Sequence, residues 1–249
     1  MSQPASFLSA TLAQTATELR LTARRGENVL VTVVTPAVVL VFFASASVLP
    51  TPAGRPVDFL LPGSIALAVI ATSLVNLGIA TAYERSYGVL KRLGGSPLTR
   101  AGLLTAKIAA VLVVELGQVV LLVVIAALAL GWSPAPGTNP VPLLGVVLLG
   151  TLAFAGLGLL LAGALRAEAT LALANALFIV AVLLGGIILP LDHLPGPLAA
   201  AAGLLPAAAL SDAVRVAFGD SLEPIRPLAI LLAWGIGSIA LAARTFRWE

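Results

Sequence analysis

The sequence predicts an all-α integral membrane protein with six transmembrane helices, because it is rich in apolar residues and these fall into runs of span length. Of the 249 residues, 59% are hydrophobic and only 10% are charged, whereas a soluble domain carries about 25% charged residues. The mean hydropathy is +1.08. A soluble fold of this length would have to expose much of that apolar surface to water, so the chain is expected to lie in a bilayer.

The first 27 residues predict an amphipathic helix that lies along the membrane surface. They lack the apolar core of a signal peptide. One helical face carries Leu8, Leu12, Thr15/Ala16, Leu19 and Ala23. The basic residues near the end of this segment are Arg20, Arg24 and Arg25. This pattern is typical of a helix in the headgroup layer, and the alternative is a solvated polar leader.

Residues 28–249 form a single membrane domain with six apolar runs, each close to the roughly 20 residues that a bilayer requires. The predicted spans are residues 28–49, 63–82, 102–130, 143–165, 169–189 and 227–243. Residues 50–62 contain four prolines and are expected to form a loop. The fourth span is rich in glycine, which favours close packing against neighbouring helices.

Two segments between the spans do not fit a simple loop. Residues 83–100 are charged, contain glycine and are helix-forming at their centre. Residues 190–224 contain two apolar stretches, 198–205 and 207–210, that are each too short to cross. Short broken helices at membrane depth persist only when protein covers them or when they line a cavity. Residues 194–219 are therefore expected to form a re-entrant external helix pair.

The distribution of basic residues predicts the orientation of the chain. Six spans place both termini on one side, and that side holds most of the lysines and arginines. Its residues are Arg20, Arg24, Arg25, Arg85, Lys91, Arg92, Arg100, Lys107, Arg166, Arg244 and Arg247. The other side holds only Arg55, Arg215 and Arg226. The positive-inside rule therefore places both termini and residues 83–100 in the cytoplasm.

Several functional classes are excluded by what the sequence lacks. It has no GxxxxGK[ST] phosphate loop, no HExxH zinc motif and no GxSxG nucleophile motif. It has no cysteine, and its single histidine, His193, lies in a predicted outer loop, so we expect no metal site and no cofactor in this chain. The basic residues flank apolar spans, which does not favour a nucleic-acid partner. A chain of this kind moves a substance across the membrane or anchors a larger complex.

Two motifs resemble the ABC type-2 permeases, and the daunorubicin-resistance-type drug exporters are the nearest subgroup. The first motif follows the second span and consists of Glu84, Arg85, Gly88, Lys91, Arg92, Ser96 and Pro97. The second lies between the fifth and sixth spans and consists of Pro190, Asp192, Pro195, Pro206, Asp212 and Arg215. With the amphipathic leader and the six spans, the resemblance covers essentially the whole chain.

The resemblance implies one permease half of an exporter in a bacterial or archaeal plasma membrane. Two such chains, identical or different, would enclose a path, and two copies of a separate P-loop ATPase subunit would bind ATP and magnesium. Residues 83–100 would be the coupling helix in a groove of the ATPase. We expect residues 86–93 to be helical and Gly94-Gly95 to end the helix. The alternative is an ordinary basic inside loop.

The resemblance also implies that the path is lined by the first, second and fifth spans. The candidate residues are Phe42, Phe43, Thr72, Ser73, Asn76, Asn175 and Phe178. Aromatic rings with a few amides and hydroxyls suit lipophilic molecules. Each of these residues is equally compatible with simple helix packing.

Three further polar residues lie inside the predicted third span: Lys107, Glu115 and Gln118. Lys107 is placed to pair with Glu84, with Arg85 directed to the headgroups, and the alternative is a snorkelling lysine. Glu115 lies near the middle of the bilayer, where a charge is costly. It is expected to tie spans together, through Gln118 or a residue of another span. The alternative is a proton or cation site.

The function expected from the sequence is ATP-driven export of a hydrophobic or amphipathic compound, such as a drug, an antibiotic or a lipid. The chain is not expected to be an enzyme by itself. One alternative is export of another cargo by the same fold, for example a polysaccharide, sodium or a component of haem maturation. The other is a membrane anchor without a cargo of its own.

Overall fold

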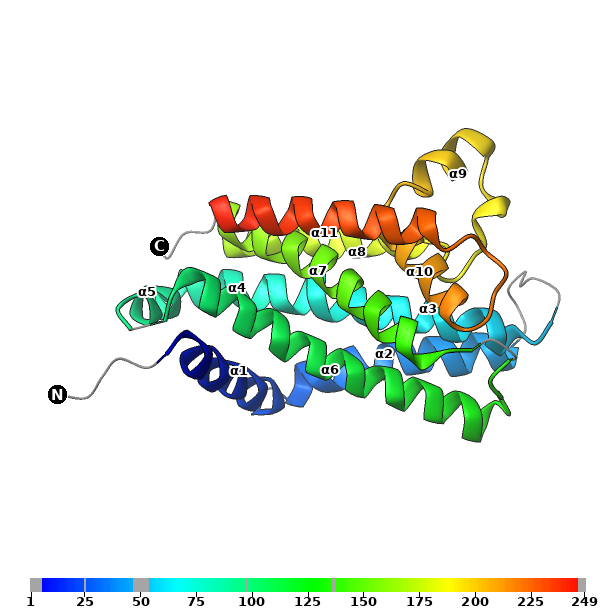
Figure 1. Ribbon diagram of the computed structural model, residues 1–249, viewed down its shortest axis with the longest axis horizontal. Helices are drawn as coiled ribbons and strands as arrows, with labels where there is room; N and C mark the ends of the chain where they lie inside the picture. The colour runs from blue at the N-terminus through cyan, green and yellow to red at the C-terminus, as the bar shows by residue number, and fades with distance from the viewer. Residues whose placement is uncertain (1–5, 25, 47–53, 97, 136–137, 246–249) are drawn as a thin grey trace.

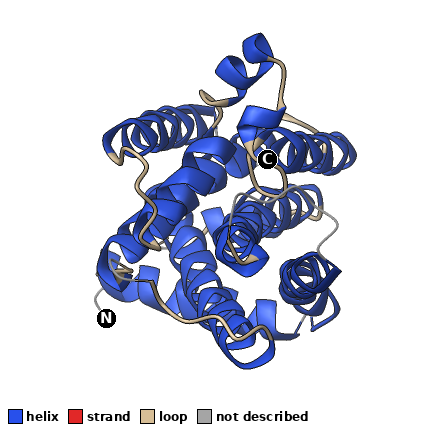
Figure 2. Ribbon diagram, turned by 90° about the vertical axis from the view of Figure 1, so that its right-hand side faces the viewer, coloured by secondary structure: helices blue, strands red, loops and turns tan. Residues whose placement is uncertain are grey.

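The protein is an elongated helical bundle, seen here in a computed structural model. The structure describes residues 6–24, 26–46, 54–96, 98–135 and 138–245, and within these ranges it contains helices and loops but no strand. Figure 1 shows the long helices running side by side along the molecule, and Figure 2 shows the same bundle from one end. The predicted all-α membrane fold is confirmed.

Five helices in the described ranges are by themselves long and apolar enough to cross a bilayer. They are the continuous helix Pro56–Ser86, α6 (Arg100–Ala129), α7 (Pro140–Ala164), α8 (Ala167–Leu184) and α11 (Ile225–Thr245). Helix α2 (Gly26–Ala46) packs against α3 and has 21 residues, or about 31 Å at 1.5 Å per residue. Its apolar part Thr32–Ala46 is shorter than a full span. Each of these six helices overlaps one of the six predicted spans.

The second of these helices begins earlier than the sequence indicated. It consists of α3 (Pro56–Ile70), the π-helical turn η1 (Ala71–Asn76) and α4 (Leu77–Ser86). The expectation of a loop through residue 62 is therefore wrong. Pro56 occupies the first turn of α3, where the N–H group that proline lacks would have no helical partner anyway. Pro62 lies inside the helix.

The chain bends sharply at the end of α4, where a continuous helix over residues 86–93 was expected. Helix α4 ends at Ser86, and Gly88 has a left-handed backbone with φ of 70°. Glycine adopts this conformation without the steric cost that a Cβ atom imposes. The short helix α5 (Val89–Gly94) then starts in a new direction. The expected helix over residues 86–93 is thus interrupted by the turn at residues 87–88.

Helix α1 (Phe7–Arg24) lies against α6 and turns its large apolar residues outward. The side chains of Leu8 and Leu12 are 67% and 59% exposed, whereas Thr11 is buried. In a membrane protein, an outward apolar face suits contact with lipid. That α1 lies in the headgroup layer stays a prediction.

Helix α7 lies at the centre of the bundle and packs against α4 and α11. It crosses the second span where Gly158 faces Gly78. A Cβ atom on Gly158 would lie 2.8 Å from the carbonyl oxygens of both Ser73 and Leu74. Glycine is therefore required for this close approach, as in other tightly packed membrane helices.

A bent helix pair lies before the last helix, as the sequence predicted. After the short 3₁₀ turn Leu191–His193 come α9 (Gly196–Ala202) and α10 (Pro206–Ala217), with an angle of 79° between them. Pro206 occupies the first turn of α10, and Pro190 and Pro195 directly precede the 3₁₀ turn and α9. Helix α10 is buried against α3, α7 and α11. In contrast, α9 protrudes at the end of the molecule (Figure 1).

The two ends of the bundle differ in what they contain. The start of α1, helix α5 and the end of α11 lie together at one end, and α9 lies at the other (Figure 1). The coupling segment and the described ends of the chain therefore share one side, as an even number of crossings requires. That this side faces the cytoplasm stays a prediction from the distribution of lysine and arginine.

Candidate functional site

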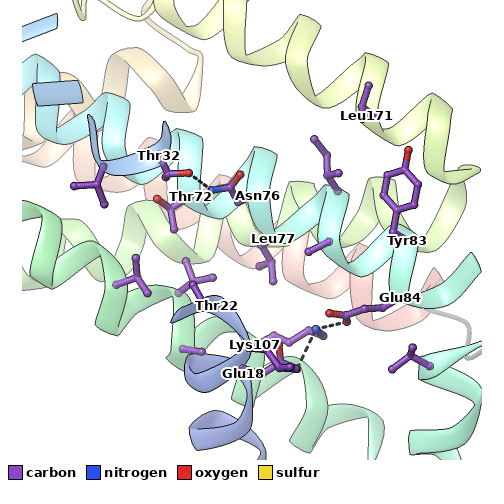
Figure 3. A pocket seen from close by; sticks show the side chains of 18 of the residues that line it. Glu18, Thr22, Thr32, Thr72, Asn76, Leu77, Tyr83, Glu84, Lys107 and Leu171 are labelled. Atoms are coloured by element: carbon purple, nitrogen blue, oxygen red, sulfur yellow. Dashed lines mark hydrogen bonds and ion pairs between the residues drawn. The ribbon is translucent and has the colours of Figure 1, made fainter. Parts of the chain in front are cut away.

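A buried lysine joins three helices at the end of the bundle that carries α5. The Nζ atom of Lys107 in α6 lies 2.6 Å from Oε2 of Glu84 in α4 and 3.0 Å from Oε1 of Glu18 in α1 (Figure 3). The lysine side chain is only 1% exposed. The expected pair with Glu84 is present, and a snorkelling lysine is excluded because the amine does not reach solvent. A buried ammonium group needs such partners to offset its desolvation.

Glu18 is a member of this ion cluster that sequence reasoning missed. It lies on the polar side of α1, and its Oε1 atom also accepts a hydrogen bond from Nε2 of Gln14 at 2.8 Å. Two polar residues four positions apart lie on one helical face. That spacing was the available signal, but it did not show which helix the face would contact.

Arg85 does not point to the headgroups as expected. Its Nη1 atom donates to the carbonyl oxygen of Gly163 at 2.6 Å, and its Nη2 atom donates to that of Leu165. Both carbonyls lie at the C-terminal end of α7, where no further turn supplies N–H partners. A positive charge is also favoured at this end of a helix dipole. Arg85 therefore connects α4 to the end of α7.

Helix α5 is held to the bundle by Leu90 and, in part, by Leu93, and presents its basic residues outward. Leu90 is fully buried against Leu77, Leu103 and neighbouring apolar residues. Lys91 and Arg92 are exposed. The loop that follows is closed by Ser96, whose hydroxyl donates to the carbonyl oxygen of Leu93 at 2.6 Å. Pro97, also assigned to the coupling motif, lies outside the described residues.

Glu115 is completely buried in the middle of α6 and ties three helices together. Its Oε1 atom accepts a hydrogen bond from Ser73 in η1, and its Oε2 atom accepts one from Thr151 in α7. The expected tie between spans is present, but it runs through Ser73 and Thr151 and not through Gln118. Thr151 is therefore a second polar residue that sequence reasoning missed.

Gln118 belongs to a separate polar group one turn further along α6. Its Oε1 atom accepts from Thr72 at 3.0 Å, and its Nε2 atom donates to the carbonyl oxygen of Thr32 at 3.3 Å. Asn76 donates from Nδ2 to the hydroxyl of Thr32. Thr72 and Asn76 lie in the π-helical turn. Leu77, which directly follows this turn, donates its N–H to the carbonyl oxygen of Thr72. Such turns occur mostly as short insertions in α-helices, frequently at functional sites.

A cavity of about 580 Å³ runs between the ion cluster and this polar group. Residues of α1, α2, η1, α4, α6 and α8 line it, and Figure 3 shows Glu18, Glu84 and Lys107 near one end and Thr32, Thr72 and Asn76 near the other. Leu77 lies between them. The size falls within the range of sites for drug-sized molecules, roughly 300–1,000 Å³.

The structure divides the residues that were expected to line a path. Thr72 and Asn76 line the cavity, whereas Ser73 points to Glu115 and is fully buried.

The other four residues lie away from the cavity lining: Phe42, Phe43, Asn175 and Phe178. The two phenylalanine rings pack edge to face, with centroids 5.2 Å apart. Asn175 is exposed on α8 and donates to the carbonyl oxygen of Leu171 in the same helix. Phe178 is half-buried and packs against the main core.

The second motif brings Arg215 into the end of the bundle that carries α9. Its guanidinium lies 4.2 Å from the centroid of the Phe59 ring and donates to the carbonyl oxygen of Gly186. Asp212 lies one turn away in α10, with its Oδ1 atom 3.3 Å from Nη1 of Arg215. Arg215 therefore fixes α10 against α3 and the end of α8. Asp192 instead lies at the surface and contacts only His193, at 3.0 Å, among the described residues.

The family of the chain follows from a comparison with known protein families. Residues 10–218 match the ABC-2 type transporter family, which is most of the 249-residue chain. The chain belongs to the ABC-2 type transporter family. No curated protein matches the sequence. This ABC-2 chain is therefore the membrane component of an ABC transporter, and membership of this family implies association with an ATPase subunit.

Proposed function

We propose that this ABC-2 chain is the permease subunit of an exporter that moves a hydrophobic or amphipathic compound out of the cytoplasm. The family match supplies the transporter class, and the observation that favours this cargo is the cavity of about 580 Å³. Most of its wall combines aliphatic side chains with a few amides and hydroxyls, and the charges of Glu18, Glu84 and Lys107 at one end are paired with each other. Such a surface suits a lipophilic molecule better than a small inorganic ion.

The energy for transport is proposed to enter through the segment of residues 83–100. The exposed Lys91 and Arg92 of α5 suit contact with a separate ATPase subunit that binds ATP and magnesium. Glu84 and Arg85 stand directly before α5 and contact Lys107 of α6 and Gly163 at the end of α7. A displacement of α5 would therefore reach two further spans through these contacts.

The complete exporter is proposed to contain two permease chains, identical or different, and two ATPase subunits. The outward face of helix α8 favours the presence of a protein partner. Its exposed residues include Leu171, Leu177 and Ile179, and the amide of Asn175 stands among them. An amide on a lipid-facing surface is unfavourable, and contact with a second chain would satisfy it. In this arrangement Phe42, Phe43, Asn175 and Phe178 would line the path at the seam.

The orientation is proposed from charge alone. The end that holds α5, the start of α1 and the end of α11 would face the cytoplasm, because basic residues favour that side. The plasma membrane of a bacterium or archaeon is the proposed location. The bent pair α9 and α10 would then lie on the outer side.

Reconstitution with its ATPase tests the proposal. The chain is co-expressed with a candidate P-loop ATPase subunit, and the complex is placed in liposomes. Lipophilic compounds are then screened for stimulated ATP hydrolysis and for ATP-dependent movement across the bilayer. The proposal predicts both effects for at least one amphipathic compound. If hydrolysis responds only to a polysaccharide or to sodium, the proposed cargo class is wrong, and a chain that binds no ATPase would be an anchor.

A further inference from the structure

The cavity has two polar ends that differ in charge, with an apolar stretch between them. At one end stand the ionisable side chains of Glu18, Glu84 and Lys107. At the other end the polar lining residues are all uncharged, namely Thr32, Thr72, Asn76 and Gln118. Between these ends α4 contributes Leu77 and Ile79, and α6 contributes Val111 and Val114. From Asn76 to Glu84 the helix rises by about 12 Å, at 1.5 Å per residue.

At the uncharged end, the amide oxygen of Asn76 receives no hydrogen bond from a described residue. Thr72 donates to Gln118, and Gln118 donates to the carbonyl oxygen of Thr32. Asn76 uses its Nδ2 atom on the hydroxyl of Thr32. Among the described residues nothing donates to its Oδ1 atom, although Asn76 lines the cavity. An amide oxygen accepts up to two hydrogen bonds, so this end is suited to receive a donor from a ligand.

A charged group is unsuited to this inner end. It would lose its hydration and, among the described lining residues at this end, would meet only neutral side chains, and a buried charge without a partner is strongly unfavourable. A purely apolar molecule would leave the Asn76 oxygen without a hydrogen bond. A hydroxyl or an amide N–H avoids both penalties.

We infer that the cavity binds an uncharged amphipathic molecule, with a hydroxyl or N–H donor against Asn76 and an apolar body of about 12 Å along α4 and α6. This inference rests on the proposed export function, for which it names the cargo chemistry. It concerns binding to the permease alone, so it is tested without the ATPase.

Photolabelling of the full chain in lipid nanodiscs tests this inference. The probe is a long-chain primary alcohol with a diazirine at mid-chain, and its methyl ether serves as the matched probe without a donor. Peptide mapping then locates the labelled residues. The alcohol is expected to label the cavity-lining part of α6 at Val111 and Val114 in a saturable manner. The ether is expected to label these positions roughly tenfold less, which is the effect of one lost hydrogen bond.

Two pairs of variants make the test specific. Asn76→Leu is expected to reduce labelling by the alcohol roughly tenfold, whereas Thr245→Val, which removes an exposed hydroxyl at the end of α11, is expected to leave it unchanged. Val114→Trp fills the cavity and should abolish labelling. Val113→Trp places the same ring next to it on the 52% exposed side of α6 and should have no effect. Thermal unfolding of all four variants identifies any that fail to fold. Because Asn76→Leu and Val114→Trp are each expected to lose labelling, either of them still tests the inference if the other does not fold.

The inference is overturned if the ether labels α6 as strongly as the alcohol does. It is equally overturned if Asn76→Leu and Val114→Trp label like the unmodified chain, or if a long-chain amine or carboxylate probe labels this site better. None of these outcomes depends on transport. A chain that exports compounds but fails here contradicts only the binding chemistry. A chain that labels as expected but never couples to ATP hydrolysis contradicts only the export function.

Discussion

The guanidinium of Arg85 lies 2.6 Å from the carbonyl oxygen of Gly163, so a residue of the proposed coupling segment is bonded to the end of α7. Its second amine donates to Leu165. Helix α7 is in turn packed against α4, α10 and α11. The end of α4 is thereby connected to the centre of the bundle through one side chain.

Replacement of Arg85 by leucine is expected to weaken this connection. Loss of a charged donor that serves two part-buried carbonyls costs about 2 kcal/mol. We expect a lower unfolding temperature and a loss of transport per ATP hydrolysed, measured in the reconstituted complex. Arg244→Leu removes the same charge from an exposed position in the last turn of α11 and serves as the control. Equal behaviour of the two variants would show that the bonds to α7 have no role in coupling.

Replacement of Gly88 by alanine is expected to impair coupling through the backbone alone. Its φ of 70° costs about 1–2 kcal/mol for a residue with a Cβ atom. No atom lies within 4 Å of a Cβ placed there, so steric overlap does not contribute. Asparagine tolerates this conformation better than alanine does and should restore activity in part. Coupled ATP hydrolysis is the measurement, and normal coupling in Gly88→Ala would contradict the role of this turn.

Charge reversal at Lys91 and Arg92 is expected to release the ATPase while the permease still inserts and folds. Both side chains are exposed, and in such positions substitutions usually change stability by less than about 0.5 kcal/mol. Co-purification of the ATPase, measured at several salt concentrations, reports on this contact. Retention of the ATPase at the level of the unmodified chain would place the contact elsewhere.

Replacement of Glu115 by glutamine is expected to leave transport largely intact. A glutamine amide can accept from Ser73 and donate to Thr151, so both ties between helices survive. Alanine removes both and should destabilise the bundle by about 1–3 kcal/mol, since interhelical hydrogen bonds in membranes contribute about 0.6–1.7 kcal/mol each. Transport and thermal unfolding are measured over a range of pH. A steep loss of transport in the glutamine variant, with a changed pH dependence, would instead indicate a proton or cation site.

Replacement of Gly158 by alanine is expected to push α7 away from the second span. The added Cβ would lie 2.8 Å from two carbonyl oxygens of η1, and relief of such an overlap costs about 1–3 kcal/mol. Gly145 lies in the same helix with nothing within 4 Å of its Cβ position. Gly145→Ala is therefore the control and should be neutral or slightly stabilising. Similar unfolding temperatures for the two variants would contradict the close approach.

The helices were predictable from sequence because each long apolar run must satisfy its own backbone hydrogen bonds in lipid. The partners of the polar side chains were not. Lys107 and Glu84 face each other because their spans are adjacent and antiparallel, and the sequence was sufficient to suggest that pair. Glu18 joined them only because α1 turns its polar side to α6, and hydropathy does not specify the neighbour of a surface helix. Arg85 was misplaced for a related reason, because its acceptors are backbone carbonyls of α7, and any residue supplies a carbonyl.

The π-helical turn Ala71–Asn76 sets the rotation of everything that follows it in the second span. One residue corresponds to about 100° around an α-helix. Deletion of a single residue from this turn would therefore rotate α4 by about that angle relative to α3. Glu84 and Arg85 would then face away from Lys107 and Gly163, while Ser73 and Thr72 could keep their bonds to α6. One extra residue in this helical turn thus fixes the rotation of α4 relative to α3. This rotation allows the polar contacts in the membrane and the contacts at the coupling end to form together.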